Sequence, residues 1–524
     1  MEKFFNIAGP CQPDRHYMLP ATARLPEVPP LIRKELYFVI HAPRQSGKTT
    51  ALKQFVRDIN ASGERVALYC SLETLQNVTD SESAIPKIKN VICESMRLSP
   101  PLAPLVDEFD ALRKKNSPSD DAATGLMTYL SELAGKCGKP LVVLFDEADC
   151  LCFDPLITFL RQLRNGYINR GEAPFPASLA LVGLRNIRDY RLRIRPDGAS
   201  VGQASPFNVI TEVLPMRLFS KDEMQTLYAQ HTTATGQAFE PAAIENAYLF
   251  SGGQPYLVNA LARWCVEKIH RDDFSHPITG ADMKEAKEKI IREQGTHLDS
   301  LLEKLEEPRV RAVVEPVMLG GTVDRTRHAD DVSYCLDLGL LVDDRGVLRP
   351  ANPIYAETIG RYLTRGVQSE IMMKRPENPW VKEDGLDMAG LLAAFQQFWR
   401  ENADANAVPY DYREAYPHLV LQAFLQRVIN GGGQIVREMA LGSERLDLGV
   451  HFRGAVYAVE VKTLAYYEKS RERAHQQVAK YMDRLGVPEG WLVVFDPDLT
   501  KPWEGKISSA DIFQDGKAVH VILC

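Results

Sequence analysis

The chain has 524 residues, more than one hydrophobic core usually organises, so about two to four domains are expected. Hydrophobic residues make up 45% and charged residues 25%, as in ordinary soluble globular proteins. The net charge of −7 excludes a chain that coats nucleic acid along its whole surface, but it leaves room for a locally basic groove.

The sequence also lacks signals for export or membrane insertion. No apolar run approaches the roughly 20 residues that span a bilayer, and residues 1–20 do not form the pattern of a signal peptide. The 9 cysteines show no paired metal spacing. We therefore expect a cytoplasmic protein with reduced thiols and no membrane contact.

The N-terminal part predicts an α/β domain. Residues 1–30 are rich in proline and are expected to form an arm, followed by a domain over residues 31–215. Short apolar segments alternate there with helical stretches, which is typical of a largely parallel sheet. The predicted strands are Leu36–Ile40, Val66–Cys70, Leu141–Phe145 and Leu179–Val182.

A phosphate-binding loop is predicted between the first strand and the next helix. It runs from Ala42 to Thr50, with Ala42 in place of the usual first glycine. Its backbone N–H groups would wrap a phosphate at the helix N-terminus. Lys48 would reach the β- and γ-phosphates of ATP, and Thr49 would hold Mg²⁺. The residues expected to bind the nucleotide are Pro43, Arg44, Gln45, Ser46, Gly47, Lys48, Thr49 and Thr50.

A second motif, which is acidic, supports the prediction of a nucleotide site. The apolar strand at Leu141–Phe145 ends in Asp146 and Glu147. Asp146 is placed to order Mg²⁺, and Glu147 to polarise the attacking water. Together the two motifs predict ATP hydrolysis.

Two helical units follow the nucleotide-binding core. Residues 216–295 have apolar side chains at helix spacing and predict a helical lid. Residues 296–365 predict three helices and a hairpin, the order of elements in a winged helix, with an unspecialised helical spacer as the alternative. Residues 366–387 are poor in apolar positions and are expected to be a linker.

Residues of roughly 30–365 resemble the AAA-like ATPases of the STAND and archaeal-ATPase group, found in bacterial defence and regulatory proteins. The matching segments are residues 42–50, 145–149, 183–189, 251–258 and 352–355. The resemblance implies that Pro255 lies against the nucleotide base and that Asn186 is a polar sensor. Taken alone, residues 252–255 are equally a plain turn at a helix start.

A dense basic cluster follows Gly183. It could supply an arginine finger to a neighbouring subunit, contact phosphates or form a solvated face, and the sequence leaves these three open. An ATPase with a sensor and such arginines is expected to form a homo-oligomer. The cluster consists of Arg185, Arg188, Arg191, Arg193 and Arg195.

The C-terminal part, residues 388–524, predicts a second α/β domain. Its strand candidates at Leu446–Phe452 and Val456–Val461 would form a hairpin that brings Asp447 close to Glu460. Glu460 and Lys462 lie two residues apart, on the same face of the strand. The other expected elements are helices at Leu391–Trp399, Ala415–Ile429 and Arg471–Leu485, and strands at Ile435–Met439 and Trp491–Phe495.

These polar residues predict a metal-dependent hydrolytic site. Asp447, Glu460 and the carbonyl of Val461 make a hard oxygen site for Mg²⁺ or Mn²⁺. Lys462 would activate water and stabilise charge on a scissile phosphate. Alternatively, the two carboxylates are solvated charges at a hairpin rim, and Lys462 is their ion-pair partner.

This Asp…Glu-x-Lys arrangement resembles the PD-(D/E)XK nuclease superfamily, over roughly residues 405–500. The resemblance implies a restriction-endonuclease-like fold in which Glu414 supplies a further acidic residue. Gln477 and Tyr481, at i and i+4 on a helix, match the extra motif of the RecB-like branch.

The sequence thus predicts an ATP-dependent or ATP-gated nuclease that hydrolyses DNA. A role in defence against phage or mobile DNA follows from the resemblance alone. The alternative is a nucleotide-switched regulator that binds DNA or a partner through a non-cleaving nuclease fold. A DNA translocase is a weaker reading, because separate helicase motifs were not found.

Overall fold

The chain divides into two compact units. The computed structural model describes residues 3–114, 121–184, 210–293, 295–318, 323–363, 379–402, 415–429, 433–441, 444–496 and 501–524. The first unit comprises residues 1–301, 330–347 and 351–354, and the second comprises residues 302–329, 348–350 and 355–524.

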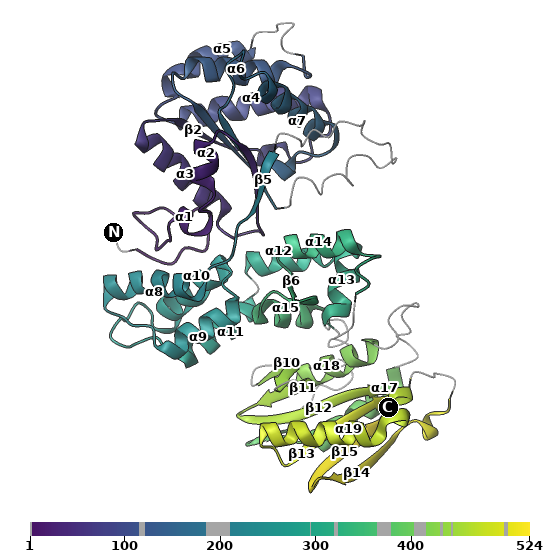
Figure 1. Cartoon of the computed structure of the whole chain (residues 1–524). Helices are drawn as coiled ribbons and strands as arrows, with labels where there is room; N and C mark the ends of the chain where they lie inside the picture. The colour runs from purple at the N-terminus through teal and green to yellow at the C-terminus, as the bar shows by residue number, and fades with distance from the viewer. Residues whose placement is uncertain are drawn as a thin grey trace. The chain divides into compact units, whose positions relative to one another are not determined.

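A five-stranded parallel sheet forms the centre of the first unit, in the order β2-β3-β4-β1-β5. Figure 1 labels its two edge strands, β2 and β5. This finding confirms the predicted α/β domain with a parallel sheet. The strands are β1 (Tyr37–His41), β2 (Val66–Ser71), β3 (Leu141–Asp146), β4 (Ser178–Gly183) and β5 (Ile210–Pro215). The residues of β1 to β4 are almost entirely buried, as expected for a sheet covered on both faces.

Helices cover both faces of this sheet. On one face, the core joins the strands to α1 (Ala21–Arg24), α2 (Val28–Arg33) and α3 (Lys48–Ser62). On the other, it joins them to α4 (Ser81–Arg97), α5 (Val106–Lys114), α6 (Gly125–Lys136) and α7 (Phe153–Ile168). The predicted arm is therefore largely packed onto the unit, since Phe5 and Tyr17 are also buried.

The helical stretch predicted after residue 216 is present. Its helices are α8 (Lys221–Thr235), α9 (Pro241–Ser251), α10 (Pro255–Arg263), which continues as a π-helical turn at Trp264–Ile269, and α11 (Gly280–Glu293). Ser220 begins α8 with a capping box, because its side chain accepts from the Glu223 amide and the Glu223 side chain accepts from the Ser220 amide.

Three helices and a hairpin then follow in the order that the sequence predicted. They are α12 (Thr296–Lys304), α13 (Pro308–Met318), α14 (Ala329–Asp337), β6 (Leu341–Asp344) and β7 (Val347–Pro350), with α15 (Pro353–Leu363) after them. A winged helix remains the interpretation of this order of elements.

The second unit contains a six-stranded mixed sheet in the order β10-β11-β12-β13-β15-β14 (Figure 1). The central pairs β12–β13 and β13–β15 are parallel, and the remaining pairs are antiparallel. The strands are β10 (Gly433–Leu441), β11 (Glu444–Phe452), β12 (Ala455–Thr463), β13 (Glu489–Phe495), β14 (Ser508–Gln514) and β15 (Lys517–Leu523).

Helices also cover the two faces of this second sheet. The core on one face includes side chains of α17 (Met388–Asn402) and α18 (Ala415–Ile429). Side chains of α19 (Leu464–Leu485) pack on the opposite face. The predicted linker ends in β8 (Val381–Lys382) and β9 (Gly385–Leu386), and Leu386 is buried in the first of these cores. This described part of the predicted linker thus belongs to the second unit.

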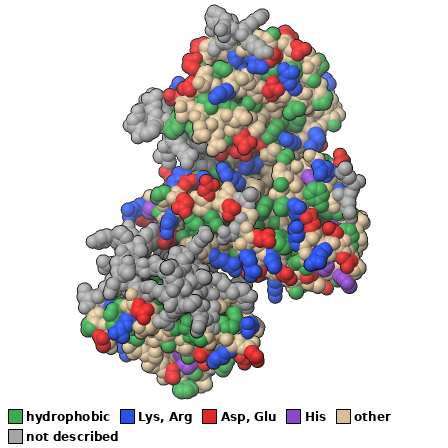
Figure 2. All heavy atoms as spheres, turned by 180° about the vertical axis from the view of Figure 1, so that it is seen from behind, with side chains coloured by type: hydrophobic (Ala, Val, Ile, Leu, Met, Phe, Trp, Pro, Cys, Tyr) green, Lys and Arg blue, Asp and Glu red, His purple; other side chains and the backbone are tan. Residues whose placement is uncertain are grey.

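Charged side chains of both signs are interspersed on the face of the molecule seen in Figure 2. Any nucleic-acid partner would therefore be held by individual sites, as the net charge of −7 already indicated. Within the described ranges, every helix is too short or too polar to cross a membrane.

Candidate functional site

The predicted phosphate-binding loop joins the end of β1 to the start of α3. Gln45 and Gly47 have positive φ angles of 54° and 88°, which is the left-handed region. Such a backbone turns its successive N–H groups inward, and α3 adds the positive end of its dipole. The loop thus has the backbone form that an anion site requires.

Lys48 lies within this loop and is almost fully buried. Its Nζ donates to the carbonyl oxygens of Ala42 at 2.9 Å and Pro43 at 3.1 Å. Burial lowers the pKa of this amine, whereas the nearby carboxylates of Glu147 and Asp146 act in the opposite direction. The amine is therefore held by two carbonyl oxygens of the loop itself, next to the start of α3.

The loop is also held from outside by residues that the motif does not contain. Nη1 of Arg24 donates to the Ser46 carbonyl at 2.6 Å, and its Nε donates to the Arg217 carbonyl at 2.8 Å. The amide of Cys11 donates to the Thr50 hydroxyl at 3.0 Å. Sequence reasoning missed Arg24 and Cys11, since no spacing pattern connects them to the loop.

Thr49 and Asp146, which the two motifs assign to Mg²⁺, lie in direct contact. The Thr49 hydroxyl donates to Oδ2 of Asp146 at 2.7 Å, and the Tyr69 hydroxyl donates to the same oxygen at 3.0 Å. Asp146 is fully buried. A hydroxyl and a carboxylate at this distance are hard oxygen donors that fit Mg²⁺.

Two further carboxylates lie close to this pair. Glu147 has a φ of 54°, and its pKa is raised first by burial, against the opposing effect of Lys48. Oδ2 of Asp149 accepts from the Leu184 amide at 3.2 Å, whereas its buried Oδ1 has no hydrogen-bond partner within the described chain. Asp149 was part of a matched segment, but no role was predicted for it.

One residue of the predicted helical lid, Gln254, contacts the phosphate-binding loop. The side chain of Gln254 donates weakly to the Gln45 carbonyl at 3.4 Å and caps α10 by accepting from the Leu257 amide. Pro255 is the first residue of α10 and is buried. Asn186 and the predicted arginine cluster lie outside the described residues.

The second predicted site lies where β11 and β12 separate. Their backbone pairing runs from Phe452 and Ala455 to Leu448 and Val459. Beyond that point, hydrogen bonds from backbone amides to carboxylate side chains take the place of the pairing between the strands. The Val461 amide donates to Oδ2 of Asp447 at 2.8 Å. The Asp447 amide donates to Oε2 of Glu460 at 3.2 Å. The separation gives the carboxylates room between the strands.

Lys462 joins the two acidic residues. Its Nζ lies 2.5 Å from Oε1 of Glu460 and 3.5 Å from Oδ2 of Asp447. The Glu460 side chain is fully buried, whereas the Asp447 side chain is 30% exposed, so the site opens toward solvent on the Asp447 side.

This burial changes the proton affinities. Desolvation, followed by the charge of Asp447, raises the pKa of Glu460 to about 7, although Lys462 opposes the shift. Burial lowers the pKa of Lys462, but Asp447 and Glu460 outweigh it and the net shift is upward. The lysine is thus a cation, and Glu460 titrates near neutral pH.

The predicted helix motif lies on the same side of this sheet. Side chains of α19 pack on the face that carries Ala458, and Tyr481 is buried against Ala458. Nε2 of Gln477 donates to the Tyr481 hydroxyl at 2.7 Å. Because Glu460 and Lys462 alternate with Val459 and Val461, they project to this face as well. Glu414 lies outside the described residues.

Comparisons with known proteins give these relatives. An uncharacterized WD repeat-containing protein of Synechocystis sp. is 22% identical over 489 residues, which cover 86% of this chain and 38% of that protein. The chain therefore spans 38% of the length of this curated relative. No family model matches the chain.

Several solved structures are also similar. A Walker-type ATPase of Pyrococcus abyssi shares 16% identity, with a TM-score of 0.48, over 68% of this chain and 99% of that one. The ORC1 protein of Aeropyrum pernix in complex with DNA shares 13%, with a TM-score of 0.35, over 67% and 95%. The RuvB Holliday junction branch migration motor of Thermotoga maritima shares 13%, with a TM-score of 0.33, over 64% and 91%.

Proposed function

We propose that the chain is an ATP-gated, metal-dependent nuclease that hydrolyses phosphodiester bonds of DNA. The observation that carries this proposal is the contact of Lys462 with both Asp447 and Glu460 at the parting of β11 and β12. A buried carboxylate, a partly exposed one and a cation then share one small site. Purely structural rim charges would be solvated on both carboxylates, and Glu460 is fully buried.

Asp447, Glu460 and the Val461 carbonyl are the residues that would hold Mg²⁺ or Mn²⁺. The bound ion would supply Lewis-acid activation of water and of a phosphoryl oxygen. Asp447 fits as a ligand because its carboxylate is partly open to solvent. Lys462 would orient the attacking water and stabilise negative charge on the phosphate. Gln477 and Tyr481 would hold α19 against the sheet beside the site. Glu414 is proposed as a further acidic residue.

The first unit would bind ATP with Mg²⁺ and hydrolyse it. Lys48 would contact the phosphates, Thr49 and Asp146 would hold the ion, and Glu147 would accept a proton from the attacking water. The raised pKa of Glu147 suits a base. Pro255 would lie against the base of the nucleotide, and Asn186 would sense the terminal phosphate.

A gating route begins at the loop itself. Nη1 of Arg44 donates to the Ser300 hydroxyl of α12 at 3.0 Å, and His41 lies 3.8 Å from Asp337 of α14. Rearrangement of the loop around a nucleotide would therefore change its contacts with both α12 and α14. We propose that this coupling, within a homo-oligomer, regulates cleavage in defence against phage or mobile DNA.

The test is cleavage of circular and linear DNA, and of RNA, by the purified chain with Mg²⁺ or Mn²⁺. Lys462→Ala is expected to reduce DNA cleavage by about 10²- to 10³-fold. Lys469→Ala is the matched control, because Lys469 is an exposed lysine of the neighbouring helix α19. This substitution should leave the cleavage rate unchanged.

Metal-dependent cleavage that persists in Lys462→Ala would show that the activity comes from elsewhere. Absence of cleavage of every substrate, with ATP turnover preserved, would replace the nuclease with a nucleotide-switched regulator that only binds DNA or a partner.

A further inference from the structure

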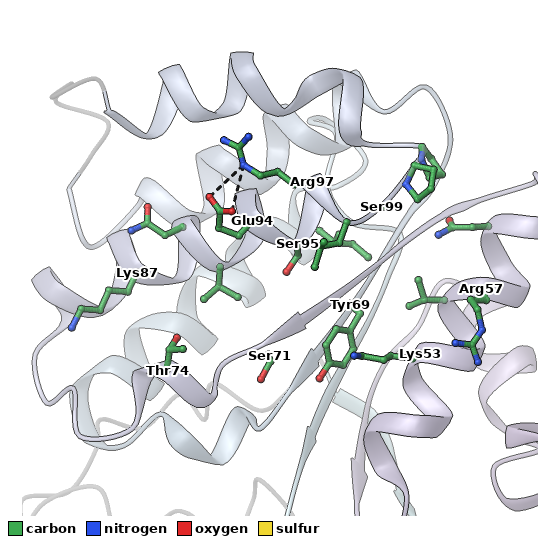
Figure 3. Close-up of a pocket in the computed structure, with 18 residues that line it drawn as sticks. Lys53, Arg57, Tyr69, Ser71, Thr74, Lys87, Glu94, Ser95, Arg97 and Ser99 are labelled. Atoms are coloured by element: carbon green, nitrogen blue, oxygen red, sulfur yellow. Dashed lines mark hydrogen bonds and ion pairs between the residues drawn. The ribbon is translucent and has the colours of Figure 1, made fainter. Parts of the chain in front are cut away.

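A cavity of about 1180 Å³ lies beside β2, the edge strand of the first unit's sheet. Figure 3 shows β2 passing between α4 and α3, with Tyr69 and Ser71 on the strand. Because α3 packs on one face of the sheet and α4 on the other, a space lined by both lies along the free edge of β2. This edge space is called the β2 groove below.

The hydrogen bonds of β2 determine which backbone groups face the groove. The amides of Val66 and Leu72 donate to the carbonyls of Pro140 and Asp146, so the even-numbered residues point to β3. Alternation then turns the backbone groups of Ala67, Tyr69 and Ser71 outward.

Asn60 confirms this direction. Its side-chain amide bonds to both outward backbone groups of Ala67. The amide oxygen accepts from the N–H at 2.7 Å, and the amide nitrogen donates to the C=O at 3.0 Å. One amide side chain thus stands where the next strand would be. The outward groups of Tyr69 have no such partner within the described chain. They remain available to an added strand.

The walls of the groove are apolar with a basic rim. Leu98 is 86% exposed at its border, which is unusual for a leucine. Lys53 lies over the Tyr69 ring at 5.2 Å, while Arg57 and Lys87 extend from the two helices (Figure 3). Glu94 is already paired with Arg97. The charge left for an occupant is therefore positive on both sides.

We propose that the β2 groove binds an extended, acidic peptide segment of a partner protein, which adds as a sixth strand beside β2. The backbone of the peptide would pair with the outward groups of Tyr69 and Ser71. Its acidic side chains would meet Arg57 and Lys87, and its apolar side chains would lie against Leu98. The six residues of β2 extend about 20 Å, so about six residues of an extended peptide would lie along the strand, and an octapeptide covers this length.

The test is selection of displayed random octapeptides on the full chain, followed by fluorescence anisotropy with the recovered peptides. We expect alternating acidic and apolar sequences. Their binding should weaken at least tenfold in the Arg57→Glu, Lys87→Glu double variant, but not in Arg161→Glu. Arg161 is an exposed arginine of α7 outside the groove. ATP turnover, unchanged in all variants, would show that each one folds.

N-methylation of alternate amides of a recovered peptide separates strand addition from simple charge attraction. In one of the two registers it should weaken binding at least tenfold. Recovery of no saturable binder, recovery of peptides without acidic residues, or equal binding after methylation in both registers would overturn the proposal. Competition by a single-stranded oligonucleotide at equal affinity would also overturn it, in favour of a nucleic-acid site.

Discussion

Glu460 is the residue on which the proposed metal site depends most. Its pKa of about 7 lies above the ordinary value of 4.5, so the folded chain holds a proton there below neutral pH. A metal ligand must be deprotonated, and a proton therefore competes with the ion. We expect Mn²⁺ affinity to fall about tenfold for each pH unit below about 7 and to level off above it.

Calorimetric titration of the chain with Mn²⁺ at several pH values measures this dependence. Glu460→Gln removes the titrating group, so its residual affinity should be weaker and flat with pH. An unchanged pH profile in Glu460→Gln would show that another group controls metal binding.

The same proton has an effect on stability in the absence of metal. Because the pKa is raised in the folded state, Glu460 binds its proton more tightly when folded, and the stabilisation is fully present below pH 4.5 and lost as pH rises through about 7. Denaturant unfolding of the metal-free chain should therefore show a midpoint that decreases over this window. Glu460→Gln should flatten that decrease, and an identical slope in both proteins would contradict the assignment.

Tyr69 links the β2 groove to the nucleotide site. Its hydroxyl donates to the Asp146 oxygen that also accepts from Thr49. Tyr69→Phe removes one of these donors, and we expect the Mg²⁺ concentration for half-maximal ATP turnover to change about threefold to tenfold. Tyr248→Phe on α9 is the control. Equal Mg²⁺ dependence in both variants would leave Tyr69 with a packing role only.

At the scale of residues, the sequence predicted contacts within a strand or between recognised motifs, but not between segments that no motif connects. Glu460 and Lys462 could be placed on one face because a strand repeats every two residues. Thr49 and Asp146 were both assigned to Mg²⁺ because each belongs to a recognisable nucleotide-binding motif. Arg24 could not be found, because its contact with the loop depends on how the N-terminal segment folds back.

At the scale of elements, the turn between α9 and α10 depends on Gly253. Its φ is +76°, and an added Cβ would lie 2.1 Å from the Phe219 carbonyl oxygen. Gly253→Ala should therefore destabilise the first unit by about 2–4 kcal/mol. Gly236, with a φ of +82° but open space around it, is the matched site, where alanine should cost about 1 kcal/mol.

Differential scanning calorimetry of the two variants compares the two costs. A larger loss of melting temperature in Gly253→Ala than in Gly236→Ala is expected. The opposite order would show that the lid can move away from Phe219 without loss.

Most elements were predicted because their apolar residues follow a clear pattern. The strands β5, β14 and β15 were not predicted. In β5 the burial is mixed, and most of β14 is exposed, so neither has the apolar run on which the other strands were recognised. The Asp515–Gly516 turn between β14 and β15 was an available signal, since Asp-Gly favours two-residue hairpins.

At the scale of the whole molecule, two α/β units with separate cores carry two sets of polar residues. The first has the form of a phosphate-binding loop on a parallel sheet, and the second has two carboxylates and a lysine at a parting of strands. Since each set lies within one unit, we expect Lys462→Ala to leave ATP turnover within about twofold of the native rate. Assay of phosphate release checks this, and loss of turnover in that variant would contradict independent active sites.

The most direct measurement is the rate of DNA cleavage with and without ATP, in the presence of Mg²⁺ or Mn²⁺. It compares the native chain with Lys48→Ala and Lys462→Ala. We predict that Lys462→Ala cleaves about 10²- to 10³-fold more slowly than the native chain in both conditions, and that ATP changes the rate only when Lys48 is intact. Cleavage by Lys462→Ala at the native rate, or the same ATP response in Lys48→Ala, would contradict an ATP-gated nuclease.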